Sequence, residues 1–334
     1  MKSAPGLAFL LIVGALAGCG GGGTTNTITL YNGQHPQLTQ ALVSAFEKKT
    51  GIHVRVRTND GIVLASQILQ EGSHSPADVY IAENSPELEA LSEQQKLAAL
   101  PTSLTSQIPT KYNSPTGTWI GQALRVSALV YNPGRISAAQ LPKRSLDLAQ
   151  PEWKGKLALA PTDSDFPPIV GAAIAENGTA ATANWLRGLK SNAVVYPDEE
   201  AVVSAVERGD QAVGLVNQYY WYRLQLEQGA SHTTSRLYFF PNHDVGSVVN
   251  VGGAGVLASS KNKPDAEAFL RFLVSAQGQR ILAHGDDFEY PTRPGIAPNP
   301  ALPPLSQLDP DSLSVAKLGD DQQSVQLIQQ SGLG

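Results

Sequence analysis

The chain has 334 residues, of which 42% are hydrophobic and 16% charged, and its formal net charge is −5. At about 150 residues per domain this length predicts two lobes, and the apolar content excludes wholesale disorder. Nucleic acid is not expected as a partner, because phosphate binding needs a basic stripe that this sequence lacks.

The N-terminal segment has the features of a processing signal. Lys2 precedes an apolar run at 7–17 that is too short to span a membrane. The run ends in Leu16-Ala17-Gly18-Cys19, which resembles the bacterial lipobox, in which the cysteine is lipidated and becomes the new N-terminus. We expect a lipoprotein signal peptide at 1–18, then a lipidated Cys19 and a flexible tether at 19–26. An ordinary signal peptide with an incidental cysteine is the alternative. Cys19 is the single cysteine, so an internal disulfide is excluded.

Strand-like and helix-like patterns alternate along the mature chain. In chain order we expect a strand at 27–31, a helix around 38–46, a strand at 53–57, a helix at 64–69, a strand at 78–82, a helix at 87–97, strands at 124–131 and 156–160, helices at 169–176 and 184–190, a strand at 193–196, a helix at 200–208, strands at 212–216 and 247–257, and helices at 264–274 and 322–330. This alternation predicts an α/β fold with mostly parallel sheets flanked by helices.

Two long apolar strands, 124–131 and 247–257, are suited to cross between two lobes as a hinge. We expect an N-terminal lobe from 27–126 plus about 250–300, and a C-terminal lobe from 127–249 plus about 301–334. In open sheets of this kind ligands bind beyond the carboxyl ends of the strands, so the residues that follow 27–31, 78–82 and 212–216 are the candidates.

Four of these residues suggest a metal site: His35, Glu83, Tyr219 and Tyr220. One carboxylate and two phenolates supply three negative charges, which balance a trivalent cation, and a bound cation lowers the pKa of phenols. Hard oxygen donors with one nitrogen suit ferric iron. Adjacent strand residues point to opposite faces, so both tyrosines must lie on the turn out of the strand. Alternatively, His35 is a solvated loop residue and Glu83 caps the next helix.

The chain resembles the bacterial periplasmic ferric-ion-binding proteins, the transferrin-like solute-binding proteins of ABC importers. The resemblance is densest at 31–35, 71–83, 129–136, 151–162, 217–223 and 288–295. It implies a two-lobed, type II periplasmic-binding-protein fold with Fe(3+) bound between the lobes by His35, Glu83, Tyr219 and Tyr220. It also implies an exported carrier that serves ABC permease and ATPase subunits, and we expect that carrier to be monomeric.

The sequence departs from that family where many members hold a synergistic anion, often phosphate. The turn at 162–166 contains Asp163, Ser164 and Asp165, and the run Asp198-Glu199-Glu200, with Glu199 as the candidate, lies where the family has an asparagine. These residues either cap helices or place a side-chain carboxylate where the anion would bind. The second interpretation predicts weak or absent phosphate dependence of iron binding. Two further candidates for this part of the site are Asn84 and Asn217.

Three other functions remain open from the residues alone. A solute-binding protein for an organic cation, such as a polyamine or thiamine, would use the aromatic residues at 219–222 as a wall. Another metal is possible with the same donors. A secreted hydrolase is disfavoured, because the sequence has no GxSxG elbow, no HExxH helix and no usable cysteine. We therefore expect a binding protein without catalytic residues.

Overall fold

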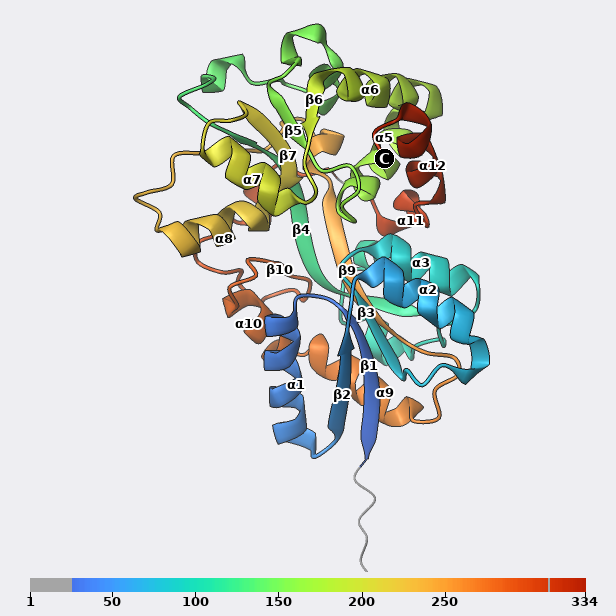
Figure 1. Ribbon diagram of the computed structural model, residues 1–334. Coiled ribbons are helices and arrows are strands. Elements are labelled where there is room, and N and C mark those ends of the chain that lie inside the picture. Colours follow the sequence, from blue (N-terminus) through green and yellow to red (C-terminus); the bar gives the residue numbers. More distant parts are fainter. Residues whose placement is uncertain (1–25, 312) are drawn as a thin grey trace, which may run out of the picture.

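The computed structural model describes residues 26–311 and 313–334. Two α/β lobes are joined by the long strands β4 (Trp119–Tyr131) and β9 (Val249–Val256), as Figure 1 shows. The expected signal peptide at 1–18 and the lipidation candidate Cys19 lie outside the described residues, as does the tether up to residue 25. Within the part of the chain that is described, no helix is long and apolar enough to cross a membrane.

The first lobe contains a sheet in the order β2-β1-β3-β9, with β4 next to β9. Its three parallel strands are β1 (Thr27–Gly33), β2 (His53–Thr58) and β3 (Val79–Ala82). The short strand β10 (Tyr290–Pro291) pairs with β4. The helices of this lobe are α1 (Pro36–Thr50), α2 (Gly61–Glu71), α3 (Ser85–Glu93), α4 (Thr102–Thr105), α9 (Lys263–Leu273) and α10 (Ala276–His284).

Helix α1 shows how the sequence sets the position of one candidate ligand. Pro36 occupies the first helical position, where its missing N–H costs no hydrogen bond. Leu38, Leu42 and Phe46 recur at helical spacing and are buried. Gly51 ends the helix in the left-handed conformation, with φ of 74°. His35 is therefore held between the end of β1 and the start of α1.

The second lobe contains the parallel strands β7 (Val213–Asn217), β5 (Leu157–Leu159) and β6 (Ala193–Val195), in that order outward from β4. The short strand β8 (Arg236–Tyr238) also pairs with β4. The helices are α5 (Phe166–Asn177), α6 (Thr179–Asn192), α7 (Glu199–Glu207), α8 (Gln218–Gln228), α11 (Val315–Leu318) and α12 (Gln322–Ser331). From α12, Leu327 and Ile328 belong to the core of this lobe.

Strand β4 connects the two sheets by changing its partner. It pairs antiparallel with β9 up to Val126 and with β7 from Ser127 onward. The predicted α/β fold is confirmed: each lobe carries a mixed sheet with helices on its faces. Pairing is parallel within β2-β1-β3 and within β7-β5-β6, whereas β4, β8, β9 and β10 pair antiparallel with their neighbours. The lobe boundaries expected from the sequence stay a prediction.

Several expected elements have different limits. The helix expected at 87–97 begins at Ser85 and ends at Glu93, because Gln95 has a positive φ of 56° and Leu97 forms a bridge with Leu257. The strand expected at 247–257 starts at Val249, after a 3₁₀ turn at Val245–Ser247. Strands β8 and β10, of three and two residues, were not expected.

Candidate metal centre

The four predicted metal ligands lie together where the two lobes face each other. His35 comes from the start of α1, Glu83 follows β3, and the tyrosines lie at the start of α8. The Nε2 atom of His35 is 3.0 Å from Oε1 of Glu83. The ring of His35 meets the ring of Tyr219 edge-on at 5.1 Å, and the rings of Tyr219 and Tyr220 are 4.0 Å apart. One imidazole, one carboxylate and two phenols therefore share one site.

The tyrosine pair lies in a different local structure from the one expected. Tyr219 and Tyr220 are the second and third residues of helix α8, not part of an irregular turn. Consecutive helical residues are about 100° apart around the axis, whereas strand residues are 180° apart, so two adjacent rings can face one site. Their ring planes are tilted by only 30°. Both phenols are buried, with 1% and 9% of their surface exposed.

The next two aromatic residues face other partners. Trp221 donates a hydrogen bond from Nε1 to the hydroxyl of Ser235 over 3.1 Å. Tyr222 stacks on Phe288, with ring centroids 5.5 Å apart. The four aromatic residues at 219–222 therefore do not form the single wall that an organic cation would need.

Arg125, a residue that the sequence analysis did not single out, lies at the centre of the site. Its side chain is fully buried on β4. The guanidinium faces carboxylate oxygens of Glu83 at 3.4 Å, Asp165 at 3.7 Å and Glu289 at 3.9 Å. It also donates to the backbone carbonyl of Glu83 and, over 2.8 Å, to the side chain of Asn84. A usable signal was present, because Arg125 is the single charged residue in the apolar segment 124–131 and an arginine is rarely buried without partners.

The charges at the site are set by burial and by these neighbours. Burial alone would lower the pKa of His35, but Glu83, Glu289 and Asp287 raise it to about 9. Burial would raise the pKa of Glu83, but His35 and Arg125 lower it. His35 and Glu83 therefore form an ion pair at neutral pH. Burial, followed by the charge of Asp165, raises the pKa of both Tyr219 and Tyr220, so a bound cation is needed to ionise the phenols.

Asp163 and Asp165 lie on the side of the site that belongs to the second lobe. Asp163 accepts the backbone N–H of Glu199, the first residue of α7, over 3.1 Å. Asp165 accepts hydrogen bonds from the side-chain amide of Asn84 over 3.1 Å and from the hydroxyl of Tyr219 over 3.4 Å. Although Asp165 takes the N-cap position of α5, it makes no side-chain capping bond there. The carboxylate of Asp163 thus occupies the start of α7, and that of Asp165 lies next to the phenol of Tyr219.

The remaining candidates of this group differ in their positions. Glu199 is buried, accepts the N–H of Asn217 over 2.6 Å, and has a raised pKa because of burial and of Asp165 and Asp163. Burial and Asp165 also raise the pKa of Asp163 to about 7. The carbonyl of Ser164 accepts from Asn84. Asn217 contacts these candidates only through its backbone N–H to Glu199, while its side-chain oxygen accepts a hydrogen bond from Asn250 on β9.

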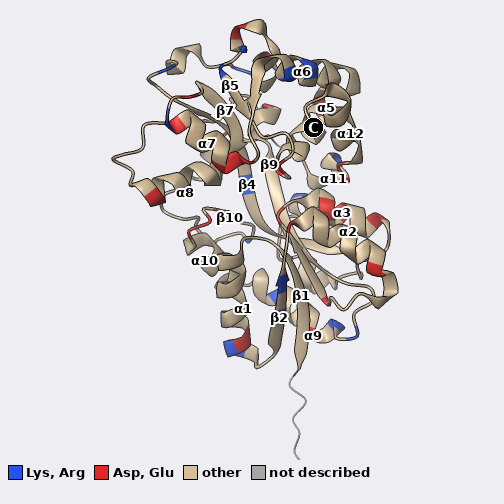
Figure 2. Cartoon of the chain, in the orientation of Figure 1, with Lys and Arg blue, Asp and Glu red and all other residues tan. Residues whose placement is uncertain are grey.

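Two further acidic residues were missed, on the loop before β10. The Oδ1 atom of Asp287 is 3.2 Å from Nδ1 of His35, and Glu289 accepts hydrogen bonds from the side chain of Gln34. Both carboxylates are buried. Glu289 lies in 288–295, one of the segments that carry the family resemblance, and Asp287 directly precedes that segment. Figure 2 shows acidic segments at the facing ends of α7 and α3.

Among the described residues, no three or more His, Cys, Asp or Glu side chains are grouped so that they alone could hold a metal ion. A metal at this site would need the phenols of Tyr219 and Tyr220 as further oxygen donors. His35, Glu83 and Ser164 also line a cavity of about 210 Å³.

Two α/β lobes with donors from both of them at the interface define a periplasmic binding protein. The sequence matches the family described as bacterial extracellular solute-binding proteins over residues 32–280, and the chain belongs to that family. It is 40% identical over 306 residues to the Fe(3+)-binding periplasmic protein of Serratia marcescens, covering 92% of this chain and 90% of the relative. It is 36% identical to the major ferric iron-binding protein of Neisseria meningitidis serogroup B, covering 92% and 93%.

The structural comparison agrees with these sequence matches. The crystal structure of iron-bound HitA from Pseudomonas aeruginosa superposes with a TM-score of 0.88 at 40% identity, over 92% of this chain and 99% of that one. The resemblance to periplasmic ferric-ion-binding proteins that the sequence indicated is thus confirmed, as is the two-lobed fold.

Proposed function

We propose that this chain binds ferric iron between its lobes through His35, Glu83, Tyr219 and Tyr220. The observation that carries the proposal is a pair of adjacent phenols beside an imidazole and a carboxylate. The ring centroids of Tyr219 and Tyr220 are 4.0 Å apart, and those of Tyr219 and His35 are 5.1 Å apart. His35 in turn forms a 3.0 Å ion pair with Glu83. Relatives that match along most of the chain are ferric-iron-binding proteins by name. The donor set, rich in hard oxygen, suits a trivalent cation better than a soft metal.

Iron entry would rearrange protons at the site. The imidazole of His35 must release Glu83 and lose the proton on the nitrogen that binds the metal. Tyr219 and Tyr220 must each lose a phenol proton, which burial opposes until a cation is present. Metal binding therefore releases protons, and acid reverses it.

We propose further that a side-chain carboxylate replaces an exogenous anion, with Asp165 as the first candidate. Asp165 lies beside the hydroxyl of Tyr219 and faces Arg125, the buried cation. Asp163 accepts the N–H at the start of α7, where a bound anion would otherwise interact with the helix. Phosphate would meet negative charge there, so iron binding is expected to depend weakly or not at all on phosphate.

The ligands come from both lobes, so the metal would stabilise the closed state. His35 and Glu83 belong to elements of the first lobe, and the tyrosines to α8 of the second. A ligand favours the conformation in which it makes more contacts, and all four donors reach one ion only when the lobes are closed. We propose that the closed form delivers iron to an ABC permease and its ATPase, and that the chain acts as a monomeric carrier and not as an enzyme.

The location follows from the N-terminal sequence. We propose that Cys19 is lipidated after removal of residues 1–18 and that the lipid holds the protein on the outer face of the cytoplasmic membrane or in the periplasm. Mass spectrometry of the mature protein tests this, because a diacylated N-terminal cysteine has a characteristic mass. An unmodified Cys19, or cleavage at another residue, would contradict the anchor without affecting the iron site.

The proposed ligand is tested by comparing ferric iron, zinc, spermidine and thiamine in thermal unfolding of the purified protein. Ferric iron, supplied on a weak chelator, is expected to raise the unfolding midpoint most, since a ligand that binds only the folded state stabilises it by mass action. A larger shift with spermidine or thiamine would retain the binding-protein class and reject iron.

A further inference from the structure

We propose that Asp287 is a positioning residue that turns the Nε2 atom of His35 toward the metal by holding the Nδ1 atom. The inference rests on the proposed function, because it takes His35 as a ligand. A metal-binding histidine commonly donates its other ring N–H to a carboxylate or carbonyl, which fixes both the tautomer and the ring orientation. The structure offers such a carboxylate at one ring nitrogen of His35.

The ring of His35 lies between two carboxylates of different roles. Nε2 faces Glu83, a proposed ligand, at 3.0 Å, and Nδ1 faces Asp287 at 3.2 Å. In the described part of the chain, Nδ1 is buried and makes no hydrogen bond of good angle, so Asp287 is the acceptor within reach. A small rotation of the ring would complete this bond. Nε2 would then bind the metal instead of contacting Glu83. Nδ1 would keep its proton and donate it in a hydrogen bond to Asp287.

The loop that carries Asp287 is held in an unusual conformation. Phe288, the next residue, has a φ of 50°, a region that residues other than glycine rarely adopt. Asp287 and Glu289 on either side of it are both buried, one against His35 and the other against Gln34 and Arg125. Strained backbone persists where the surrounding structure holds it in place, and it is frequent at binding sites.

Helix α8, which carries the two tyrosines, fixes this loop from the second lobe. Gln218 donates from its side chain to the carbonyl of Phe288 over 2.9 Å and accepts the N–H of Val126 over 2.7 Å. The ring of Tyr222 stacks on Phe288. The same helix that presents the phenols therefore fixes the loop that orients the histidine, which couples the two halves of the site.

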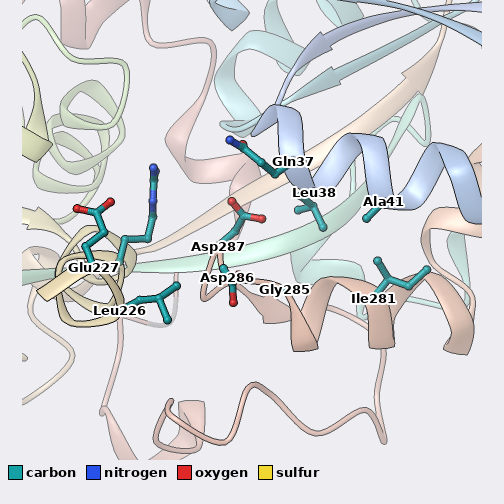
Figure 3. Close-up of a pocket in the computed structure, with 10 residues that line it drawn as sticks. Gln37, Leu38, Ala41, Leu226, Glu227, Ile281, Gly285, Asp286 and Asp287 are labelled. Carbon is teal, nitrogen blue, oxygen red and sulfur yellow. The ribbon is translucent and has the colours of Figure 1, made fainter. Parts of the chain in front are cut away.

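Asp287 also differs from its neighbour in the chain. Figure 3 shows Asp286 and Asp287 at the end of α10, between α1, which carries Gln37 and Leu38, and Leu226 and Glu227 of α8. The two aspartates line one cavity of about 320 Å³, but Asp286 is exposed and Asp287 is buried. Asp286 thus provides a matched control for the loss of a negative charge at this loop.

The test measures iron affinity by competition with a chelator for the wild-type protein and for D287A, D287N, D286A, H35A and the double variant H35A/D287A. Loss of an outer partner of a metal ligand typically weakens binding about 10- to 100-fold, and we expect this for D287A, with D286A unchanged. D287N is expected to retain most of the affinity, since its amide oxygen accepts the same N–H. In the H35A background D287A should have no further effect, because Asp287 acts through His35.

The possible outcomes separate the inference from the proposed function. If the wild-type protein binds no iron, the proposed function fails. If it binds iron and D287A binds as tightly, or if D287A weakens binding equally with and without His35, the positioning role is overturned while the iron site remains. A D287N variant as weak as D287A would assign the effect to charge and also overturn the role. Nitrogen NMR with Ga(3+) as a diamagnetic probe should show a protonated Nδ1 on His35 in the wild type and lose it in D287A.

Discussion

Asn84 and Asp165 come from different lobes and share a hydrogen bond of 3.1 Å, donated by the side-chain amide of Asn84. Asn84 also accepts a hydrogen bond from Arg125, so one amide joins the buried cation to the carboxylate that lies next to Tyr219. This contact holds Asp165 beside Tyr219, where we propose that its carboxylate replaces an exogenous anion.

The role of Asp165 predicts how iron binding responds to phosphate. The wild-type protein should bind iron with an affinity that changes less than about twofold when phosphate is removed. D165A should bind iron about 100-fold more weakly than the wild type, equivalent to about 2.7 kcal/mol of binding free energy. It should regain part of the lost affinity when phosphate or carbonate is added. Chelator competition at several anion concentrations measures both effects. D210N, on the exposed Asp210, is the control for charge; strong phosphate dependence in the wild type would contradict the account.

The tyrosines and the histidine should contribute unequally to affinity. Y219F and Y220F each remove a donor that carries negative charge when iron is bound, whereas H35A removes a neutral one. Each tyrosine variant should therefore lose more affinity than H35A, and Y219F/Y220F should abolish binding. Equilibrium titration against a chelator of known affinity gives the comparison. Normal iron binding by Y220F would show that the second residue of the pair does not contact the metal.

Replacement of Arg125 should destabilise the iron-free protein and increase the stabilisation that bound iron gives. R125M leaves Glu83, Asp165 and Glu289 buried without their shared cation, and breaking a buried ion pair from one side typically costs about 3–5 kcal/mol. Iron supplies positive charge at the same place, so it should stabilise R125M more than the wild type. Urea unfolding with and without iron measures this. R208M removes an exposed pair with Asp210 and should cost at most about 1 kcal/mol.

Glu87 should make stability fall as pH rises. The hydroxyl oxygen of Tyr80 is 2.8 Å from both the carbonyl oxygen of Gly61 and Oε2 of Glu87. The hydroxyl has one hydrogen, which it can donate to only one of them. Both hydrogen bonds form only if Tyr80 donates to Gly61 and a protonated Glu87 donates to Tyr80. Burial raises the pKa of Glu87 to about 8 from a usual value of 4.5. The folded state thus holds a proton that the unfolded chain releases between these values, and the free energy of unfolding falls by at most about 1.4 kcal/mol per pH unit.

The variant E87Q isolates this contribution, because its amide is neutral at every pH. Its unfolding free energy, measured in urea from pH 5 to 8, should fall less steeply than that of the wild type. E93Q changes an exposed glutamate of the same helix and should keep the wild-type slope. Equal slopes for E87Q and the wild type would contradict a protonated Glu87.

The sequence was sufficient to predict the fold because its core signals are local. Periodic apolar residues in α1, a stop at Gly51 and alternation in β1 and β2 each depend on a few neighbouring positions. The ends of elements were harder to predict. Strand β4 begins at Trp119, and a register shift between Gly121 and Ala123 interrupts its alternation.

The candidate site was predictable in its four inner residues and not in their supports. His35, Glu83 and the tyrosines follow strand ends, where parallel sheets place ligands. Arg125 and Asp287 reach the site only because β4 crosses between the lobes and because the chain returns to the first lobe after residue 250. Those approaches depend on tertiary packing between distant segments. The lone charge of Arg125 in an apolar strand indicates that it has buried partners, but not which carboxylates those partners are.

The visible absorption spectrum during titration with ferric iron tests the central claim most directly. Phenolate bound to ferric iron gives a ligand-to-metal charge-transfer band, which neither zinc nor an organic cation produces. The account predicts a saturable coloured band at one iron per protein that is absent in Y219F/Y220F. Saturable iron binding without colour, or a band that persists in the double variant, would contradict the assignment of the two tyrosines as ligands.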